Sequence, residues 1–216
     1  MIRFSLIRHA RTQWNLEKKL QGRKDLPLCA QGEIDARVWA EKLVDLSFDR
    51  ILASPLIRAR QTATIIADRL KIEIVYDEDL VEQNFGQWEG LNIKELRRSC
   101  PGELERMEAL GWAFRPPEGE DRTEVLIRGL RALARTAEKL EDKNLLVVTH
   151  NTMIKCLIYH GMGRQFLPEE PEVLQPFHLQ ELEWDSGIKA LDLNPMDLME
   201  ERRGRGSGSD KKEGLK

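Results

Sequence analysis

The amino-acid sequence predicts an α/β fold, a three-layer α/β/α sandwich with a mostly parallel central sheet. Four short apolar runs have the length of strands, and segments with helical spacing of apolar residues lie between them. This alternation is typical of βαβ units, in which helices cover both faces of a parallel sheet. The fourth run, residues 145–148, is uninterrupted Leu-Leu-Val-Val, as expected of a strand that is covered on both faces.

The first predicted strand spans residues 2–7, and a predicted helix at residues 33–46 leads to the second strand at residues 50–53. The helix after the second strand has the clearest pattern. Ser54 suits its N-cap, because a serine hydroxyl accepts from a free backbone N–H, and Pro55 suits the first helical position. One apolar face contains Leu56, Ala59, Ala63, Ile66 and Leu70.

The third predicted strand spans residues 72–76. A long helix is predicted to begin at Asp121, an N-cap residue with Glu124 at the capping-box position, and its apolar face continues to Leu140. The fourth strand is followed by a predicted helix at residues 151–160.

Less regular segments complete the chain. Residues 92–121 are rich in proline and glycine, and we interpret them as helical pieces folded over the sheet, a candidate lid. Residues 177–184 and 188–193 predict a hairpin. Residues 1–199 are expected to form one domain, and residues 200–216, rich in Gly, Ser and Lys, a disordered tail.

The composition is that of a soluble globular protein, with 41% hydrophobic and 33% charged residues among 216. No apolar run is long enough to cross a membrane, and no secretory signal is recognised, so we expect a cytoplasmic protein. The widely spaced Cys29, Cys100 and Cys156 favour neither a disulfide framework nor a zinc site. A net charge of −3 gives no reason to expect a nucleic-acid partner.

Polar residues follow the predicted strands. The first strand leads into Arg8 and His9, the second into the helix with Arg58, the third is followed by Glu82, and the fourth by His150. In open α/β sheets, ligands bind beyond the carboxyl ends of the strands. Each residue alone has an ordinary structural explanation, such as a surface ion pair or a core histidine. Their joint placement predicts one small pocket at this edge of the sheet.

The chemistry of such a pocket follows from its charges. Two guanidinium groups bind the oxygens of a phosphoryl group and stay charged at physiological pH. A neutral imidazole, of either His9 or His150, can attack phosphorus if a hydrogen bond fixes its tautomer. A carboxylic acid at Glu82 can protonate the leaving alkoxide. The pattern therefore indicates phosphoryl chemistry on a small phosphorylated substrate.

These residues lie in motifs that resemble, in order and in approximate spacing, those of the histidine phosphatase superfamily, also called the phosphoglycerate mutase-like family. The motifs extend from the N-terminus to about residue 160, and the second is similar to the phosphatase branch. They are LIRHARTQWN, QGRKDLPLCAQG, ASPLIRARQTA, LVEQNFGQWEG and VVTHN.

The resemblance implies roles for individual residues. His9 is the implied nucleophile that becomes phosphohistidine, and Glu82 is the implied proton donor that later activates water. The implied ligands of the phosphoryl group are Arg8, Arg58 and His150, with Asn15 and Gln21 also lining the pocket. The family needs neither a metal nor an organic cofactor, so we expect none here.

The sequence also departs from the family pattern. Ala10 replaces a usual glycine, which is acceptable if the backbone there has a negative φ. Arg11 replaces an acidic or amide residue, and either favours a more anionic substrate or faces solvent. Asn151 replaces a glycine after the second histidine and puts a backbone contact to phosphate in doubt.

Three functions are compatible with these motifs: a phosphomonoesterase, a 2,3-bisphosphoglycerate-dependent phosphoglycerate mutase, and a catalytically silent module that binds phosphorylated ligands. A mutase is expected to carry a long basic insertion, whereas residues 92–121 are short and contain several glutamates, so hydrolysis is favoured. The substrate stays open. Residues of the candidate lid or of the second motif either contact it or have only structural roles: Trp112, Phe114, Arg115, Arg23 and Lys24.

Overall fold

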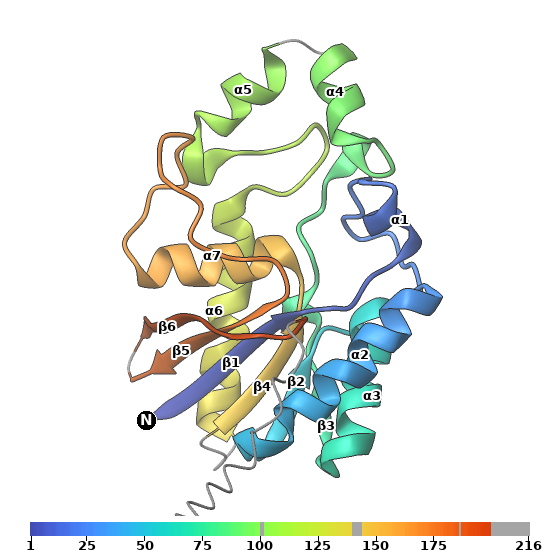
Figure 1. The fold of residues 1–216 in the computed structure, drawn as a ribbon. Coiled ribbons are helices and arrows are strands. Elements are labelled where there is room, and N and C mark those ends of the chain that lie inside the picture. Colours follow the sequence, from blue (N-terminus) through green and yellow to red (C-terminus); the bar gives the residue numbers. More distant parts are fainter. Residues whose placement is uncertain (100–101, 140–143, 186, 200–216) are drawn as a thin grey trace, which may run out of the picture.

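The structure is a computed structural model that describes residues 1–99, 102–139, 144–185 and 187–199. One six-stranded sheet has the order β3-β2-β4-β1-β5-β6 (Figure 1). Its strands are β1 (Ile2–Arg8), β2 (Arg50–Ala53), β3 (Ile74–Tyr76), β4 (Asn144–Thr149), β5 (His178–Trp184) and β6 (Ile188–Asp197).

The centre of the sheet is parallel. β1 pairs with β4, β4 with β2, and β2 with β3 in parallel register. β5 and β6 add antiparallel strands beyond β1 and form the predicted hairpin. β1 and β4 therefore lie side by side, and their last residues, Arg8 and Thr149, are opposite each other.

Helices connect the strands. The α-helices are α1 (Gln13–Leu16), α2 (Ala30–Leu43), α3 (Ile57–Leu70), α4 (Ile93–Ser99), α5 (Glu103–Glu108), α6 (Arg122–Lys139) and α7 (Asn151–Gly161). Short 3₁₀ helices are η1 (Val44–Leu46), η2 (Glu78–Leu80), η3 (Gly86–Trp88) and η4 (Gly111–Ala113).

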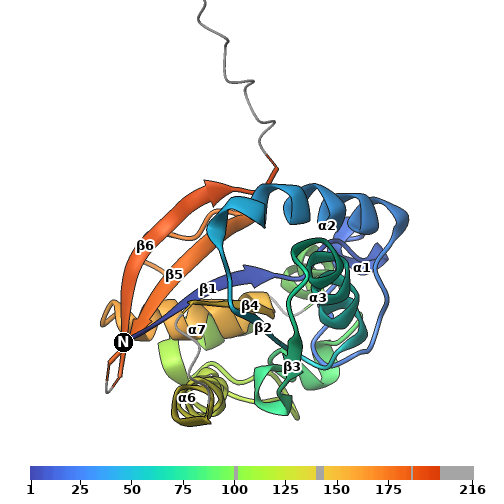
Figure 2. The same ribbon diagram turned by 90° about the horizontal axis from the view of Figure 1, so that it is seen from below.

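Helices cover both faces of the sheet, as Figure 2 shows, with α2 and α3 on one side and α6 and α7 on the other. The apolar run of β4 explains this arrangement. Leu146 and Val148 pack in the core cluster with α2 and α3, whereas Leu145 and Val147 pack in the cluster with α6 and α7. All four side chains are 0% exposed. The predicted three-layer α/β/α sandwich is confirmed.

The predicted start of α6 is confirmed by a reciprocal capping box. The Glu124 amide donates to Asp121 Oδ1 at 2.8 Å, and the Asp121 amide donates to Glu124 Oε2 at 2.9 Å. Two otherwise free backbone N–H groups are therefore satisfied at this helix end.

The predicted start of α3 is wrong. The helix begins at Ile57 and not at Pro55, and the Ile57 amide donates to the carboxylate of Asp25 at 2.6 Å. Ser54 is not the N-cap, because the helix begins later. Its amide donates to Val148 of β4, and its hydroxyl lies 2.7 Å from His150 Nε2 and accepts from the Leu56 amide at 3.4 Å, before the first helical residue. A distant loop residue supplies the cap, which local sequence did not indicate.

Other predicted boundaries shift by a few residues. The third strand starts at Ile74 instead of residue 72, and β6 continues to Asp197. The α2 helix begins at Ala30 and ends at Leu43, where a 3₁₀ turn continues to Leu46. These differences lie at element ends, where propensity is weakest and tertiary hydrogen bonds decide.

Residues 92–99 and 102–121 form helical pieces beyond the carboxyl ends of the central strands (Figure 1). Leu96, Leu104 and Phe114 of this segment pack with Trp88 in a small separate cluster. The function of this segment as a lid stays a prediction.

The predicted tail, residues 200–216, lies outside the described residues. Within the described part of the chain, no helix has the length and apolar character that crossing a membrane requires.

Candidate active site

A small cavity lies at the carboxyl ends of β1 and β4, where the sequence predicts a site. Its volume is about 100 Å³. We call it the phosphate cavity. The residues that line it come from five segments that are distant in sequence: Arg8, His9, Lys19, Leu20, Gln21, Gly22, Arg58, Glu82, Phe85, Asn151 and Thr152.

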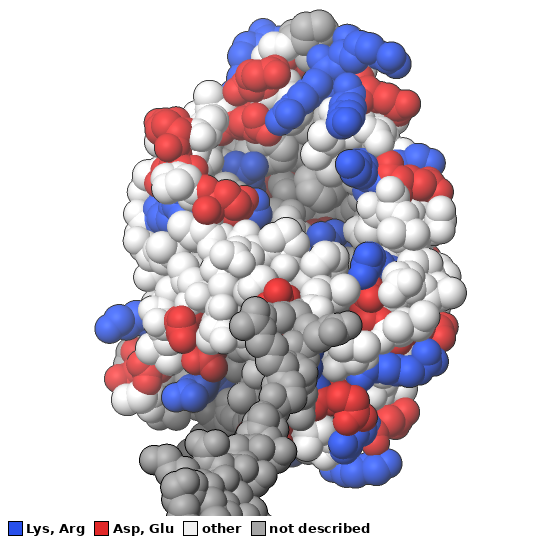
Figure 3. Space-filling model, viewed as in Figure 1, with Lys and Arg blue, Asp and Glu red and all other residues white. Residues whose placement is uncertain are grey.

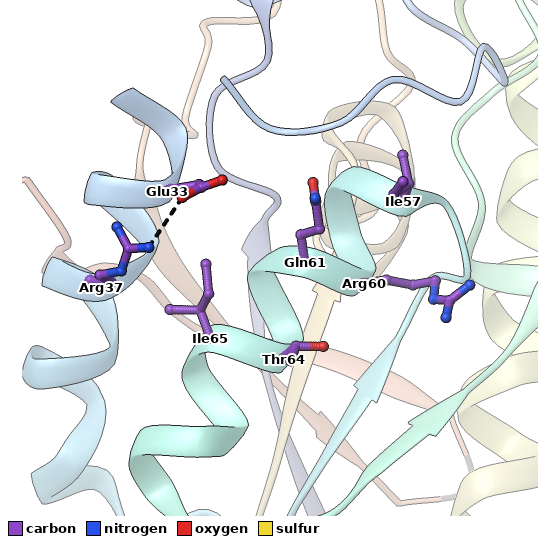
Figure 4. A pocket seen from close by; sticks show the side chains of 7 residues that line it. All are labelled: Glu33, Arg37, Ile57, Arg60, Gln61, Thr64 and Ile65. Carbon is purple, nitrogen blue, oxygen red and sulfur yellow. Dashed lines mark hydrogen bonds and ion pairs between the residues drawn. The ribbon is translucent and has the colours of Figure 1, made fainter. Parts of the chain in front are cut away.

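A larger groove of about 450 Å³ lies between α2 and α3 (Figure 4). None of the predicted site residues lines it. Glu33 and Arg37 form an ion pair with each other across one helical turn there. The larger groove therefore contains an ion pair but neither histidine, so size alone does not mark the site.

The hydrogen bonds of His9 determine its tautomer. Nδ1 lies 2.8 Å from the carbonyl oxygen of Ala10. A carbonyl only accepts, so Nδ1 carries the proton of the neutral ring. Nε2 is then unprotonated and accepts from Nε of Arg58 at 3.1 Å. The ring is fixed with its lone pair on the nitrogen beside the cationic groups of the cavity, as attack on phosphorus requires.

The substitution of alanine for glycine at position 10 fits the backbone. Ala10 is not among the described residues with a positive φ, and its side chain is fully buried in the core cluster that α2 and α3 form. Its amide donates to Thr62 Oγ1 at 3.0 Å. The amide bond to Thr62 and the buried side chain hold Ala10 in place, and its carbonyl therefore stays beside His9 Nδ1.

Arg58 is 0% exposed, although it carries a charge. Its guanidinium donates to the carbonyls of Lys24 and Gly22, both at 2.7 Å, in addition to His9. Burial lowers its pKa to about 10, so the group is still protonated at neutral pH. Arg58 therefore connects α3, the residue 22–24 loop and the His9 ring.

Arg8 is partly buried at the end of β1 and lines the same cavity. Burial lowers the pKa of its guanidinium, and the charge of Glu82 opposes this effect. Its Nε has no hydrogen-bond partner among the described residues. Arg8 and Arg58 thus give the cavity two cationic groups, which suit an anion with several oxygens.

Glu82 is held by the N-terminus of α7. Its Oε1 accepts from the amide of Gln83 at 2.9 Å and from the amide of Thr152 at 3.2 Å. The side chain is 6% exposed. The carboxyl group is therefore oriented by backbone N–H groups and lines the cavity that also contains His9.

His150 lies beside His9, with the ring centroids 5.2 Å apart. Its Nε2 is 2.7 Å from Ser54 Oγ, whereas its Nδ1 is buried without a hydrogen-bond partner among the described residues. Sequence reasoning missed Ser54 as its partner, because the residue had an apparent function as a helix cap.

The two amide residues predicted to bind substrate differ in placement. Gln21 lines the phosphate cavity, is 6% exposed, and has a buried Oε1 without a hydrogen-bond partner. Asn15 is not among the lining residues, and its Oδ1 accepts from the amide of Thr12 at 2.9 Å in a capping box of α1. The substrate-binding functions of both stay predictions.

Several other charged or aromatic candidates have structural contacts. Arg11 forms a two-point ion pair with the buried Asp35 of α2, at 2.6 and 2.9 Å. Trp112 donates from Nε1 to a backbone carbonyl at 2.9 Å, and Phe114 packs edge-on against Trp88. These contacts favour a structural role over substrate contact for Trp112 and Phe114.

The sequence analysis did not identify Arg128 of α6, which holds the Glu82 loop. All five of its guanidinium N–H groups have acceptors. They are the carbonyls of Asp79, Val81 and Glu82, and both carboxylate oxygens of Glu120. Arg128 lies three residues after Val125 on the buried face of α6, and a charge at such a position is the signal that could have revealed it.

Replacing Arg128 with lysine is expected to destabilise the protein by about 3 kcal/mol, because one ammonium cannot replace five fixed donors and leaves buried acceptors unsatisfied. Urea denaturation would measure the free energy of unfolding. Arg131→Lys is the matched control on the same helix. Arg131 is 59% exposed in its ion pair with Asp79, so a change below about 1 kcal/mol is expected. Equal effects of the two variants would contradict this interpretation.

Both histidines of the site are buried, which makes stability depend on pH. Burial, followed by nearby arginine charges, lowers the pKa values of His9 and His150 well below the usual 6.5. The unfolded chain therefore binds protons below about pH 6.5 that the folded protein does not bind. The free energy of unfolding is expected to fall between pH 7 and pH 5, by up to about 1.4 kcal/mol per pH unit for each histidine.

Denaturation of the parent protein and of His9→Gln over this pH range tests the expectation. The variant lacks one of the two imidazoles and is expected to lose stability less steeply as the pH falls. Identical slopes for the two proteins would show that protonation of His9 does not oppose folding.

No cluster of three or more His, Cys, Asp or Glu side chains that could hold a metal ion occurs within residues 1–99, 102–139, 144–185 and 187–199. The cationic side chains that line the phosphate cavity are Arg8, Lys19 and Arg58.

Comparisons with known proteins agree with this geometry. The family model described as histidine phosphatase superfamily (branch 1) matches residues 4–194. The chain is 36% identical over 159 residues to the uncharacterized phosphatase PhoE of Bacillus subtilis, covering 73% of this chain and 76% of that protein. It is also 36% identical over 163 residues to the probable phosphoglycerate mutase GpmB of Enterobacter sp., covering 76% of both.

A solved structure shares the whole fold. Bacillus stearothermophilus YhfR superposes with a TM-score of 0.82 at 28% identity, covering 93% of this chain and 100% of that chain. The family model alone spans far more than half of the sequence. The chain belongs to the histidine phosphatase superfamily.

Proposed function

We propose that the protein is a phosphomonoesterase that hydrolyses a small phosphorylated metabolite through a phosphohistidine intermediate, without a metal or an organic cofactor. The observation that carries this proposal is the contact of His9 Nδ1 with the Ala10 carbonyl, which leaves Nε2 unprotonated in a cavity that two arginines and Glu82 also line. In this proposal His9 supplies the nucleophile, the two arginines bind the anion, and Glu82 supplies the proton donor.

The proposed first step forms a bond between His9 Nε2 and phosphorus. The ester bond breaks, and its electron pair goes to the leaving oxygen, which takes a proton from the carboxylic acid of Glu82. Arg8 and Arg58 neutralise the charge on the phosphoryl oxygens during this step. The alcohol leaves, and phosphohistidine remains.

In the second step, a water molecule attacks the phosphohistidine. The Glu82 carboxylate takes a proton from this water, the bond between phosphorus and nitrogen breaks, and the electron pair returns to His9. Inorganic phosphate is released, with His9 neutral and Glu82 protonated again. The cycle is balanced and needs no other reactant.

A mutase would return the phosphoryl group to another hydroxyl instead of to water. Similar proteins include one named a phosphatase and one named a probable phosphoglycerate mutase, so the comparisons do not separate the two reactions. The content of residues 92–121 favours hydrolysis, because the glutamates there do not suit a surface that holds a second acidic group of the substrate.

The experiment is phosphate release from a panel of phosphorylated metabolites in a metal-chelating buffer. A parallel reaction contains 3-phosphoglycerate and 2,3-bisphosphoglycerate and is analysed for isomerisation. Release of phosphate is the expected result. Isomerisation without release would assign the protein as a mutase. Neither activity, together with tight binding of a panel member, would favour a silent binding module.

A further inference from the structure

A second cavity, of about 350 Å³, lies beside α7 and the start of α6. We call it the distal cavity. Arg122, Lys155, Tyr159 and Phe166 contribute to its lining, and Glu108 of α5 reaches it from the candidate lid. It shares no lining residue with the phosphate cavity. Figure 3 shows that the face of the molecule between the candidate lid and the sheet is hollowed, with both signs of charge around the hollow.

Successive turns of α7 line the two cavities. Asn151 and Thr152 line the phosphate cavity, whereas Lys155 and Tyr159 line the distal cavity. With a rise of about 1.5 Å and a turn of about 100° per residue, Asn151 and Lys155 share a face about 6 Å apart, and Thr152 and Tyr159 about 10 Å apart. A leaving group that runs along α7 from the phosphate cavity would therefore point toward the distal cavity.

The carboxylates around the distal cavity already have partners. Glu172 accepts from Lys155 and from the hydroxyl of Tyr159. Glu170 accepts from two backbone amides of its own loop, at 2.9 and 3.1 Å. Glu108 lies 3.7 Å from an arginine of α4. The protein itself therefore balances most of the negative charge at this cavity.

Arg122 differs from these groups, because no carboxylate forms an ion pair with it among the described residues. Its guanidinium lies between the rings of Phe114 and Phe166, 4.2 Å from each centroid. Nη1 donates to the carbonyl of Gly111 at 3.1 Å. Burial lowers its pKa to about 10, which leaves it protonated at neutral pH. The two rings fix the plane of this cation at the wall of the cavity.

We propose that the distal cavity binds the far end of the leaving group and that Arg122 binds a second anionic group there. The proposal rests on the proposed phosphatase function and specifies its substrate class. The substrate is a phosphomonoester that carries a carboxylate or a second phosphate at the end of its leaving group that is remote from the transferred phosphoryl group. Of the cations weighed from the sequence, Arg23 and Arg115 are less suited, because both are in ion pairs with carboxylates.

Matched substrates test this proposal. 6-Phosphogluconate and sorbitol 6-phosphate differ only in a carboxylate or a hydroxymethyl group at the far end of the chain. Glucose 1,6-bisphosphate and glucose 6-phosphate test a distal phosphate in the same way. p-Nitrophenyl phosphate, which has no distal anion, reports the phosphatase reaction alone. The parent protein is expected to show a kcat/KM about 10-fold or more higher for at least one distal anion than for its neutral partner.

Variants then assign the preference to Arg122. In Arg122→Gln the ratio between the members of a pair is expected to fall to about one, and Arg122→Lys, which keeps the charge but loses the flat donor pair, is expected to be intermediate. Arg60→Gln is the matched control. Arg60 of α3 stacks on Tyr76 of β3 and lines neither the phosphate cavity nor the distal cavity. This control is expected to keep the ratio of the parent.

The outcomes separate this proposal from the proposed function. Hydrolysis of p-nitrophenyl phosphate with no preference in either pair would overturn the distal site and leave the phosphatase intact. A preference that persists in Arg122→Gln would overturn the role of Arg122. No phosphate release from any of these esters would overturn the phosphatase, and the substrate class with it. The preference of the parent is measured without a variant, so poor folding of Arg122→Gln does not prevent the test.

Discussion

Replacement of His9 by alanine is expected to abolish both turnover and phosphoenzyme formation. The loss in kcat should be about 10⁵-fold or more, since the variant removes the nucleophile and leaves only groups that bind charge. Nδ1 of His9 is held by the Ala10 carbonyl, so Nε2 is the nitrogen that should carry the phosphoryl group. Mass spectrometry of the enzyme quenched in base during turnover would locate the phosphorylated residue.

His160→Ala is the control for this variant, because His160 is an exposed histidine at the far end of α7. It is expected to retain the activity and the phosphoenzyme of the parent. If His9→Ala still formed phosphohistidine, the adduct would have to be on another residue. His150 would then be the first candidate, since its ring lies 5.2 Å from that of His9.

Replacement of Glu82 by glutamine is expected to slow the reaction in a way that depends on the leaving group. Alkyl phosphates should lose about 10²- to 10⁴-fold in kcat, because their alkoxide needs a proton. p-Nitrophenyl phosphate should lose much less, because its phenolate leaves without one. Glutamine can still accept from the amides of Gln83 and Thr152, so the loop should keep its position. Phosphate release from both kinds of ester measures the effect.

Glu118→Gln is the matched control for this prediction. Glu118 is exposed, and its carboxylate accepts from the side chain of Gln87 at 2.9 Å. The same chemical change there should leave both kinds of ester unaffected. An equal loss for alkyl and nitrophenyl esters in Glu82→Gln would mean that Glu82 positions the substrate and is not the proton donor.

The central strands of the sheet were predictable from the sequence because they are short segments rich in apolar residues. Residues 145–148 can only be buried on both faces, and the structure places alternate members in the two cores. The convergence of Arg8, His9, Arg58 and Glu82 was predictable for a related reason. They follow strand ends, and parallel strands bring their carboxyl ends to one edge.

The supporting contacts were not predictable from local sequence. Ser54 had every property of a helix cap, but it continues the ladder to β4, and Asp25 from a distant loop caps α3 instead. Arg128 looked like one of many helix arginines until the fold placed the Glu82 loop against it. Such contacts depend on residue pairs more than 30 positions apart. Periodicity indicates that Arg128 lies on the buried face of α6, but it does not indicate which residues the guanidinium contacts.

The burial of two arginines and two histidines around one cavity links folding to ligand concentration. These groups repel one another or resist protonation in the folded chain, whereas an anion in the cavity is attracted to them only after folding has brought them together. By mass action, any anion that binds only the native state raises the free energy of unfolding. The increase is about 2.7 kcal/mol when the anion concentration is a hundred times its dissociation constant. The amount of folded protein would then increase with the supply of any such anion, even before any turnover occurs.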